Sequence, residues 1–233
     1  IDWDKKNHLS KLVGENGPVY TTLEMLGVAT SYYKNPFYFG NKHNICLGPS
    51  FWEEDELVTQ EENDHLQKSF SEDEIKVAIF GSYAHGAPGP DGLSFLFYQT
   101  FWDVIKNDFM ALVRDFEEGK LDMQRLNFAL IVLIPKEPDA KDMKKFRAIS
   151  LLNCCFKIFT KVLTNRLALI IGKLISENQS AFIRGRYILE SVVTAHGVLH
   201  TTHSFGRKGM ILKIDYEKAY DKVNLDFVYE VLE

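Results

Sequence analysis

The most constraining feature of the sequence is an apolar run near its C-terminal end that finishes in a carboxylate. Residues 210–214 read Met-Ile-Leu-Lys-Ile, and Asp215 follows them directly. A run of this composition predicts a strand. A strand end holds its side chains rigidly, which suits a carboxylate that binds a divalent cation such as Mg²⁺. The alternative is a strand that ends in a solvated aspartate.

A rigid loop is predicted at residues 86–92, which read Gly-Ala-Pro-Gly-Pro-Asp-Gly. The prolines and glycines impose sharp turns, although a linker loop without a ligand fits this composition equally well. A helix is expected before the loop, because Ser71 and Glu74 can form a capping box, and Gly81 is expected to end it. After the loop, aromatic and aliphatic residues at helical spacing, among them Phe101, Phe109 and Val113, predict one long core helix over 94–117.

Strand and helix patterns continue through the second half of the chain. The continuous apolar run at 128–134 predicts a buried strand. A second long helix is expected over 154–174, with a solvated face that includes Arg166. Residues 175–186 form a turn-rich, basic element. Two further helices are expected, over 189–201 and from 224 onward.

Five segments, taken in order, resemble reverse transcriptases of non-LTR (LINE-type) retrotransposons, and those of plant LINE elements most of all. The similarity covers about residues 60–233. Two positions depart from the family pattern: Gly86 stands where a basic residue is common, and Ala148 replaces a proline. The segments are A-P-G-P-D-G at 87–92, I-P-K at 134–136, F-R-x-I-S-L at 146–151, Q-S-A-F-x-x-G-R at 179–186 and D-x-x-x-A-Y-D at 215–221.

The resemblance implies a role for several side chains. Asp215 would be the catalytic, metal-binding acid, and Tyr220 the aromatic floor that excludes a 2′-hydroxyl from the incoming sugar. Lys136 and Arg147 would hold the triphosphate of the incoming nucleotide, which suits a mobile ammonium and a planar guanidinium fork. The template and primer would run along four residues of the basic element, Gln179, Arg184, Gly185 and Arg186.

The fold implied by the resemblance is α/β (α+β) and helix-rich. It corresponds to a partial right-hand polymerase fold, with the fingers and the first part of the palm. The expected domains are an irregular, acidic connector at 1–66 and the truncated N-terminal part of a reverse transcriptase domain at 67–233. Within the connector, a short helix is expected around 19–33.

The net charge of −5 by itself argues against a nucleic-acid partner, but the charges are unevenly distributed along the chain. Residues 1–120 contain 10 Lys and Arg against 20 Asp and Glu, whereas residues 136–213 contain 14 against 5. A local basic stretch of this kind is the expected footprint of phosphate contact. A lysine-rich surface without a ligand fits the same counts.

The activity that the family implies is RNA-directed DNA synthesis, with an RNA template, a DNA primer, a dNTP and Mg²⁺ as cofactor. Two-metal catalysis needs more acids than Asp215. The [YF]-x-D-D turn that supplies them in the family does not occur in these 233 residues, and Asp221 is interpreted as a structural cap. The chain is therefore expected to be a fragment of the polymerase, inactive alone. The alternatives are a non-catalytic nucleic-acid-binding remnant and a degenerate product without activity.

The sequence also bears on location. Its apolar runs are too short to span a bilayer, and its first residues lack the features of a signal peptide. Three cysteines, two of them adjacent, form neither a metal-binding spacing nor a disulfide framework. We expect an intracellular protein, in the nucleus or the cytoplasm, without a membrane partner.

Overall fold

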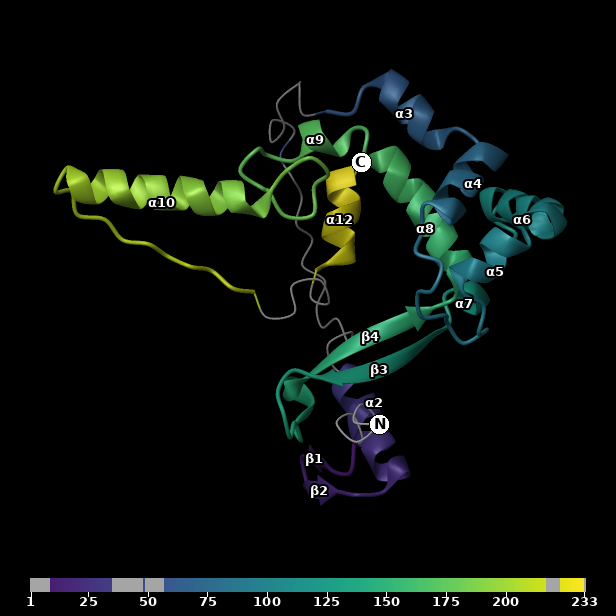
Figure 1. The fold of residues 1–233 in the computed structure, drawn as a ribbon, viewed down its shortest axis with the longest axis horizontal. Helices are drawn as coiled ribbons and strands as arrows, with labels where there is room; N and C mark the ends of the chain where they lie inside the picture. The colour runs from purple at the N-terminus through teal and green to yellow at the C-terminus, as the bar shows by residue number, and fades with distance from the viewer. Residues whose placement is uncertain (1–8, 35–47, 49–56, 217–222, 233) are drawn as a thin grey trace. The chain divides into compact units, whose positions relative to one another are not determined.

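A computed structural model describes residues 9–34, 48, 57–216 and 223–232 (Figure 1). These residues form a helix-rich, mixed α/β structure with two small sheets, which confirms the predicted fold class. The chain divides into two compact units. The first draws on Ile1–Phe51, Ile131–Ser150 and Ile214–Glu233, and the second on Trp52–Leu130 and Leu151–Lys213. Among the described helices, none is long and apolar enough to cross a membrane.

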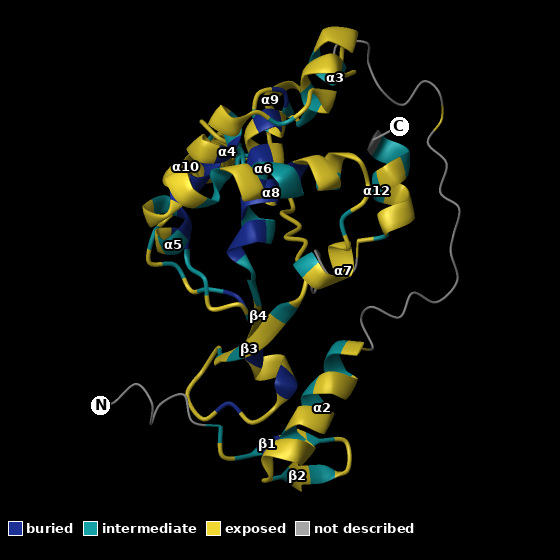
Figure 2. Cartoon of the chain, turned by 90° about the vertical axis from the view of Figure 1, so that its right-hand side faces the viewer, coloured by how far each residue is buried: buried dark blue, intermediate teal, exposed yellow. Residues whose placement is uncertain are grey.

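The second unit is built from helices around an aromatic and aliphatic core, and Figure 2 shows its buried residues concentrated on them. Phe159 stacks on Phe109 with ring centroids 5.9 Å apart and also contacts Phe116, at 4.8 Å. The core helices are α4 (Glu72–Phe80), α5 (Phe95–Thr100), α6 (Trp102–Glu117) and α8 (Cys154–Leu167). The helices without a buried residue are α3 (Gln60–Gln67), α7 (Met123–Leu126), α9 (Ile171–Leu174) and α10 (Ile188–Ser204).

Two predicted long helices are each divided in the structure. The helix expected over 94–117 is interrupted at Phe101, whose φ of −103° and ψ of 14° separate α5 from α6. Phe101 was expected in the core stripe, but it is 48% exposed, whereas Phe109 and Val113 are buried as predicted. The helix expected over 154–174 ends as α8 at Leu167, and α9 begins after a turn. Periodicity in the sequence continues across such turns, so it does not locate them.

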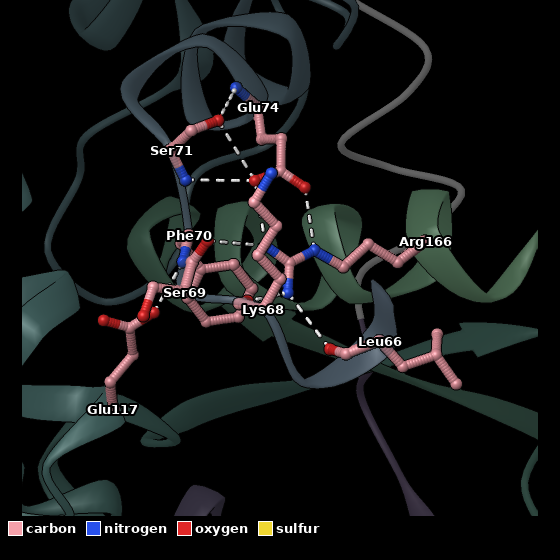
Figure 3. Close-up of polar contacts among 8 residues, drawn as sticks. All are labelled: Leu66, Lys68, Ser69, Phe70, Ser71, Glu74, Glu117 and Arg166. Atoms are coloured by element: carbon pink, nitrogen blue, oxygen red, sulfur yellow. Dashed lines mark hydrogen bonds and ion pairs between the residues drawn. The ribbon is translucent and has the colours of Figure 1, made fainter. Parts of the chain in front are cut away.

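Arg166 on α8 is buried, with 4% of the residue exposed, although the sequence predicted it on a solvated face. Figure 3 shows its guanidinium enclosed by the segment that precedes α4. Nε and Nη2 donate to the two carboxylate oxygens of Glu74, at 2.7 and 2.8 Å. The other hydrogen bonds go to the carbonyl oxygens of Leu66 and Ser69, both at 3.1 Å, and of Lys68. The prediction was wrong because helical spacing does not show that a distant segment folds over this face.

Glu74 belongs to the N-terminal cap of α4 as well as to this ion pair. Its amide donates to the Ser71 hydroxyl at 3.2 Å, and its carboxylate accepts from the Ser71 amide at 3.0 Å. The predicted capping box is thus confirmed. Hydrogen bonds from Arg166, and then from the Ser71 amide, lower the pKa of Glu74 from 4.5 to about 2. One carboxylate therefore fastens α4 to α8.

We expect the free energy of unfolding to depend on the charge of Glu74 in acid. The folded-state pKa lies below the unfolded-state value, so the stabilisation is complete above about pH 4.5 and is lost as the pH falls toward about 2. Urea unfolding measured at several pH values across this window tests the expectation. Glu74→Gln keeps a capping side chain without the charge, and it should flatten this part of the profile. If Glu74→Gln leaves the pH dependence of the unfolding free energy unchanged, Glu74 is not the group responsible for it.

The first unit contains short strands and a helix from the N-terminal part of the chain. β1 (Leu12–Gly14) and β2 (Gly17–Val19) pair antiparallel and lead into α2 (Thr22–Lys34), close to the helix expected around 19–33. Residues 9–34 are therefore ordered, and the expectation of an irregular segment was wrong for this part. The strands have three residues each, which is too short for an alternating pattern to reveal them. The domain boundary at 66/67 stays a prediction.

The N-terminal elements pack on the tip of a second hairpin. The Val13 amide donates to the Lys141 carbonyl at 2.8 Å, and Leu12 packs with Met143 and Phe146 in a small core. The hairpin consists of β3 (Ala129–Pro135), the 3-10 helix η3 (Met143–Lys145) and β4 (Phe146–Leu152). The predicted C-terminal helix is present as α12 (Leu225–Leu232).

Two predicted strands differ from their expectation. The strand at 128–134 forms as β3 but is not buried, since Leu130 is 50% and Ile131 56% exposed. A sheet of two strands does not bury its own faces. Residues 210–214 form no strand, and Met210 is 94% exposed. A strand needs a paired neighbour for its backbone hydrogen bonds, and among the described residues none pairs with this segment.

Candidate nucleic-acid interface

The A-P-G-P-D-G loop is fastened to the start of α8. A Cβ at Gly89 would lie 2.4 Å from the backbone nitrogen of Asn153, so a larger residue fits there only if the backbone moves. The Asn153 side chain accepts from the Asp91 amide at 3.2 Å, and Lys157 donates to the Ala87 carbonyl at 3.0 Å. The loop therefore has a clear structural role: it positions the first turn of α8.

The predicted nucleotide-binding residues Lys136 and Arg147 lie together on the β3–β4 hairpin. The Lys136 amide donates to the Lys145 carbonyl at 2.8 Å, which pairs these two residues. Arg147 is the second residue of β4 and Lys136 directly follows β3, so the two residues stand at the same end of the paired strands. Both residues are exposed. The Lys136 ammonium donates to the Lys144 carbonyl at 2.9 Å, which leaves two of its three donors for a ligand.

The charge of the neighbouring Lys145 is balanced within the hairpin. Its ammonium lies 2.6 Å from a carboxylate oxygen of Glu137, and this hydrogen bond raises the pKa of Lys145. Arg147 has no such carboxylate partner among the described residues. Its guanidinium is therefore available to bind phosphate.

The basic element at 175–186 is organised by Arg186. Its Nη1 donates to the carbonyls of Ser176 and Gln179 at 2.6 and 2.8 Å, and its Nη2 to those of Gly172 and Ile175 at 2.7 and 2.8 Å. These bonds cap the end of α9 and hold the following turn. The predicted template role of Arg186 stays a prediction, but most of its donors are already used within the loop.

The three other predicted template residues of this element are exposed. Gln179 donates from Nε2 to the Ala181 carbonyl at 3.1 Å. Gly185 has a φ of +84°, a left-handed conformation that glycine adopts without strain. Arg184 lies next to it and forms no ion pair with a described residue, so its guanidinium is available for phosphate. These roles stay predictions.

Asp215 is exposed and stands in an irregular segment. Among the described residues, no group of three or more His, Cys, Asp or Glu side chains could hold a metal ion. Asp215 by itself does not make the complete Mg²⁺ site that the sequence interpretation requires, because that chemistry needs several oxygen ligands. Tyr220 and Asp221 lie outside the described residues.

Sequence reasoning missed one exposed side chain in the basic element. Phe182 has a φ of +67° and is 89% exposed, two residues before Arg184. The signal was present, because an aromatic residue close to basic residues, here Arg184 and Arg186, is typical of nucleic-acid-binding segments. The motif was instead interpreted through its charged residues alone.

Lys136 and Arg147 on the hairpin, and Arg184 in the basic loop, are exposed cations of a kind that can bind phosphate. Residues 134–233 match the family described as reverse transcriptase (RNA-dependent DNA polymerase). The reverse transcriptase part of the resemblance is thus confirmed over residues 134–233.

Two relatives make the assignment more specific. The transposon TX1 uncharacterized 149 kDa protein of Xenopus laevis is 30% identical over 207 residues, 88% of this chain and 16% of that protein. The retrovirus-related Pol polyprotein from type-1 retrotransposable element R2 of Nasonia vitripennis is 27% identical over 175 residues, 74% of this chain and 16% of that protein. The chain thus spans 16% of the length of each of these relatives.

Proposed function

We propose that the chain is the N-terminal part of an RNA-directed DNA polymerase domain whose intact protein adds dNMP units to a primer 3′-hydroxyl on an RNA template. The observation that carries the proposal is the reverse transcriptase match at 134–233. It contains every residue to which a catalytic or binding role was assigned, from Lys136 to Tyr220. The fingers and the beginning of the palm are the parts that we assign to this chain.

The roles follow from the chemistry of the side chains. Arg147, with Lys136 beside it on the hairpin, would bind the triphosphate of the dNTP. Arg184 would bind a backbone phosphate of the template or primer, and Gly185 lets the backbone approach that phosphate. Asp215 would supply one ligand to Mg²⁺. The further carboxylates that a two-metal site requires would come from a motif outside this chain.

We also propose a source and a location. The five motifs resemble those of plant LINE elements, which makes such an element the proposed origin. An intracellular site, nuclear or cytoplasmic, is consistent with the free thiols of Cys154 and Cys155, both of which are buried.

Primer extension on an RNA template tests the proposed activity. A longer protein that contains this chain together with a Y-x-D-D motif should incorporate dNTPs. The chain alone should not, with Mg²⁺ or Mn²⁺, because its carboxylate set is incomplete. Failure of the longer protein to extend a primer would overturn the proposal, and the alternative of a non-catalytic remnant would then stand. Extension by the chain alone would overturn the assignment as an inactive fragment.

Binding experiments should separate the two arginines of the basic loop. Arg184→Ala should weaken binding to a single-stranded oligonucleotide and lower the slope of log K against log salt by about 0.7, as expected for one phosphate contact. Its melting temperature should not change. Arg186→Ala should instead lower the melting temperature, because it frees four carbonyls.

Arg125→Ala is the control for this pair, since its side chain is 89% exposed and lies outside the loop. It should leave both the slope and the melting temperature unchanged. If Arg184→Ala also leaves the slope of log K against log salt unchanged, Arg184 does not belong to the nucleic-acid interface.

A further inference from the structure

The tip of the β3–β4 hairpin is packed against residues 9–34, which we call the N-terminal module. Leu12 of this module is 1% exposed and lies in a small core together with residues of the tip. The buried residues that the tip supplies to this core are Ala140, Met143 and Phe146. A Cβ at Gly14 would lie 2.9 Å from Cγ2 of Val28, so α2 packs closely on β1. The module is therefore a packed element that can support the tip.

The module also joins the tip through its backbone. Val13 is paired with Pro18 of β2, and its amide donates outside that sheet, to the Lys141 carbonyl at 2.8 Å. An isolated parallel bridge connects Val13 with Asp142, the next residue. The edge of β1 is thus used to hold the segment that leads into η3.

Hydrogen bonds lead from this segment to the side chain of Lys136. The Asp142 carboxylate accepts from the Lys144 amide at 2.9 Å and so caps η3. The Lys144 carbonyl in turn accepts from the Lys136 ammonium at 2.9 Å. The position of the ammonium therefore depends on a turn that the N-terminal module holds.

Arg147 depends on the same packing through its neighbour Phe146. Phe146 is 6% exposed and belongs to the core around Leu12, whereas Arg147 is exposed. Both residues belong to β4, and successive side chains of a strand point to opposite faces. The N-terminal module therefore covers the face of Phe146 and leaves the face of Arg147 exposed.

We infer that the N-terminal module positions the two cations of the nucleotide site, with Leu12 and Val13 as positioning residues. This inference rests on the proposed function, in which Lys136 and Arg147 bind the triphosphate of the dNTP. A two-stranded hairpin is marginally stable by itself, so its cations would have to be ordered by the nucleotide, at a cost in affinity. A tip that is fixed in advance avoids this cost. The module therefore acts on dNTP affinity and not on the chemical step.

Hydrogen exchange followed by NMR tests the support of the tip in this chain. Val13→Pro removes one donor at an edge strand, where proline is tolerated, and should speed exchange of the Lys136 and Lys145 amides about twofold to tenfold. Leu12→Ala should speed it further, because it empties a core position. Exchange in α8, which belongs to the second unit, should stay at the parent rate and show that the variants are folded.

Two control variants accompany these changes. Val13→Ala keeps the amide that donates to Lys141, so exchange at the tip should stay at the parent rate. Leu23→Ala removes a leucine of the same module that is 80% exposed, and it should alter neither exchange nor dNTP use.

Single-nucleotide primer extension by a longer, active protein that contains the chain tests the effect on the site. Val13→Pro should raise the KM for dNTP about twofold to tenfold, and Leu12→Ala at least as much, with kcat and primer–template affinity nearly unchanged. In a protein that already carries Lys136→Ala and Arg147→Ala, the same changes should raise KM no further, because the module acts through these two side chains.

The outcomes distinguish the inference from the proposed function. If Arg147→Ala raises KM while Leu12→Ala and Val13→Pro do not, the positioning role is overturned and the nucleotide site stands. A further rise in KM when both cations are already removed also overturns positioning, and so does unchanged exchange at the tip in both module variants. If neither Lys136→Ala nor Arg147→Ala changes KM, the proposed nucleotide site fails and the inference fails with it.

Discussion

Asp215→Asn is expected to reduce primer extension by orders of magnitude in an active protein that contains this chain. The substitution keeps the size and most of the hydrogen bonding of the side chain. It removes the negative charge with which a carboxylate binds a divalent cation, and charge is what Mg²⁺ selects. Single-turnover primer extension at saturating dNTP measures the loss. Melting temperature should not fall, because Asp215 is exposed and stands outside helices and strands.

Asp221→Asn is the matched control, since it removes the second carboxylate of the same motif. The sequence predicts a helix cap at Asp221, whose loss should cost about 1 kcal/mol of stability and leave incorporation nearly unchanged. If Asp215→Asn leaves incorporation intact while Asp221→Asn abolishes it, the catalytic acid has been placed at the wrong end of the motif. Equal, mild effects of both changes would remove the catalytic role altogether.

Arg166→Ala is expected to destabilise the second unit by about 3 kcal/mol, the low end of the cost of breaking a buried ion pair, because the Glu74 side chain is 33% exposed. The change leaves the Glu74 carboxylate and the carbonyls of Leu66, Lys68 and Ser69 without their donor. It also removes a cation from the face of the Phe70 ring, 4.5 Å from its centroid. Urea unfolding followed by far-UV circular dichroism measures the free energy.

Lys161→Ala on the same helix is the control, because Lys161 is exposed. It should change the free energy of unfolding by less than about 0.5 kcal/mol. A double-mutant cycle of Arg166→Ala with Glu74→Gln should show coupling on the order of 1–3 kcal/mol. An Arg166→Ala variant as stable as the Lys161→Ala variant would show that the guanidinium contacts do not contribute to folding.

Features encoded by neighbouring residues were predictable from the sequence. The capping box at Ser71 and Glu74 was found because both partners lie within four residues. The buried positions of Phe109 and Val113 followed from helical spacing. Features that depend on distant segments were not predictable in the same way. Arg166 is bound by a segment about 100 residues away, and no periodicity reports such a contact.

The same distinction between local and distant determinants applies to the candidate site. Lys136 and Arg147 were correctly expected on the two arms of one hairpin, since Lys136 directly follows β3 and Arg147 is the second residue of β4. The strand at 210–214 was not found, because its formation depends on a paired neighbour and not on its own composition. Phe182 was overlooked, since its backbone conformation is not visible in a motif. The role of Asp215 stays a prediction from the motif, since the described residues contain no group of three or more ligands that could hold a metal ion.

The packing of α8 bears on how such a domain can be inherited. α8 begins at Cys154, inside the matched segment 134–233, whereas its core partners α4, α5 and α6 all precede residue 134. A recombination event at residue 134 would transfer the buried face of α8 without the helices that cover it. A transferred segment would therefore have to begin upstream of the Leu66 carbonyl, which Arg166 contacts, to keep this packing. The folding unit extends further toward the N-terminus than the matched segment 134–233.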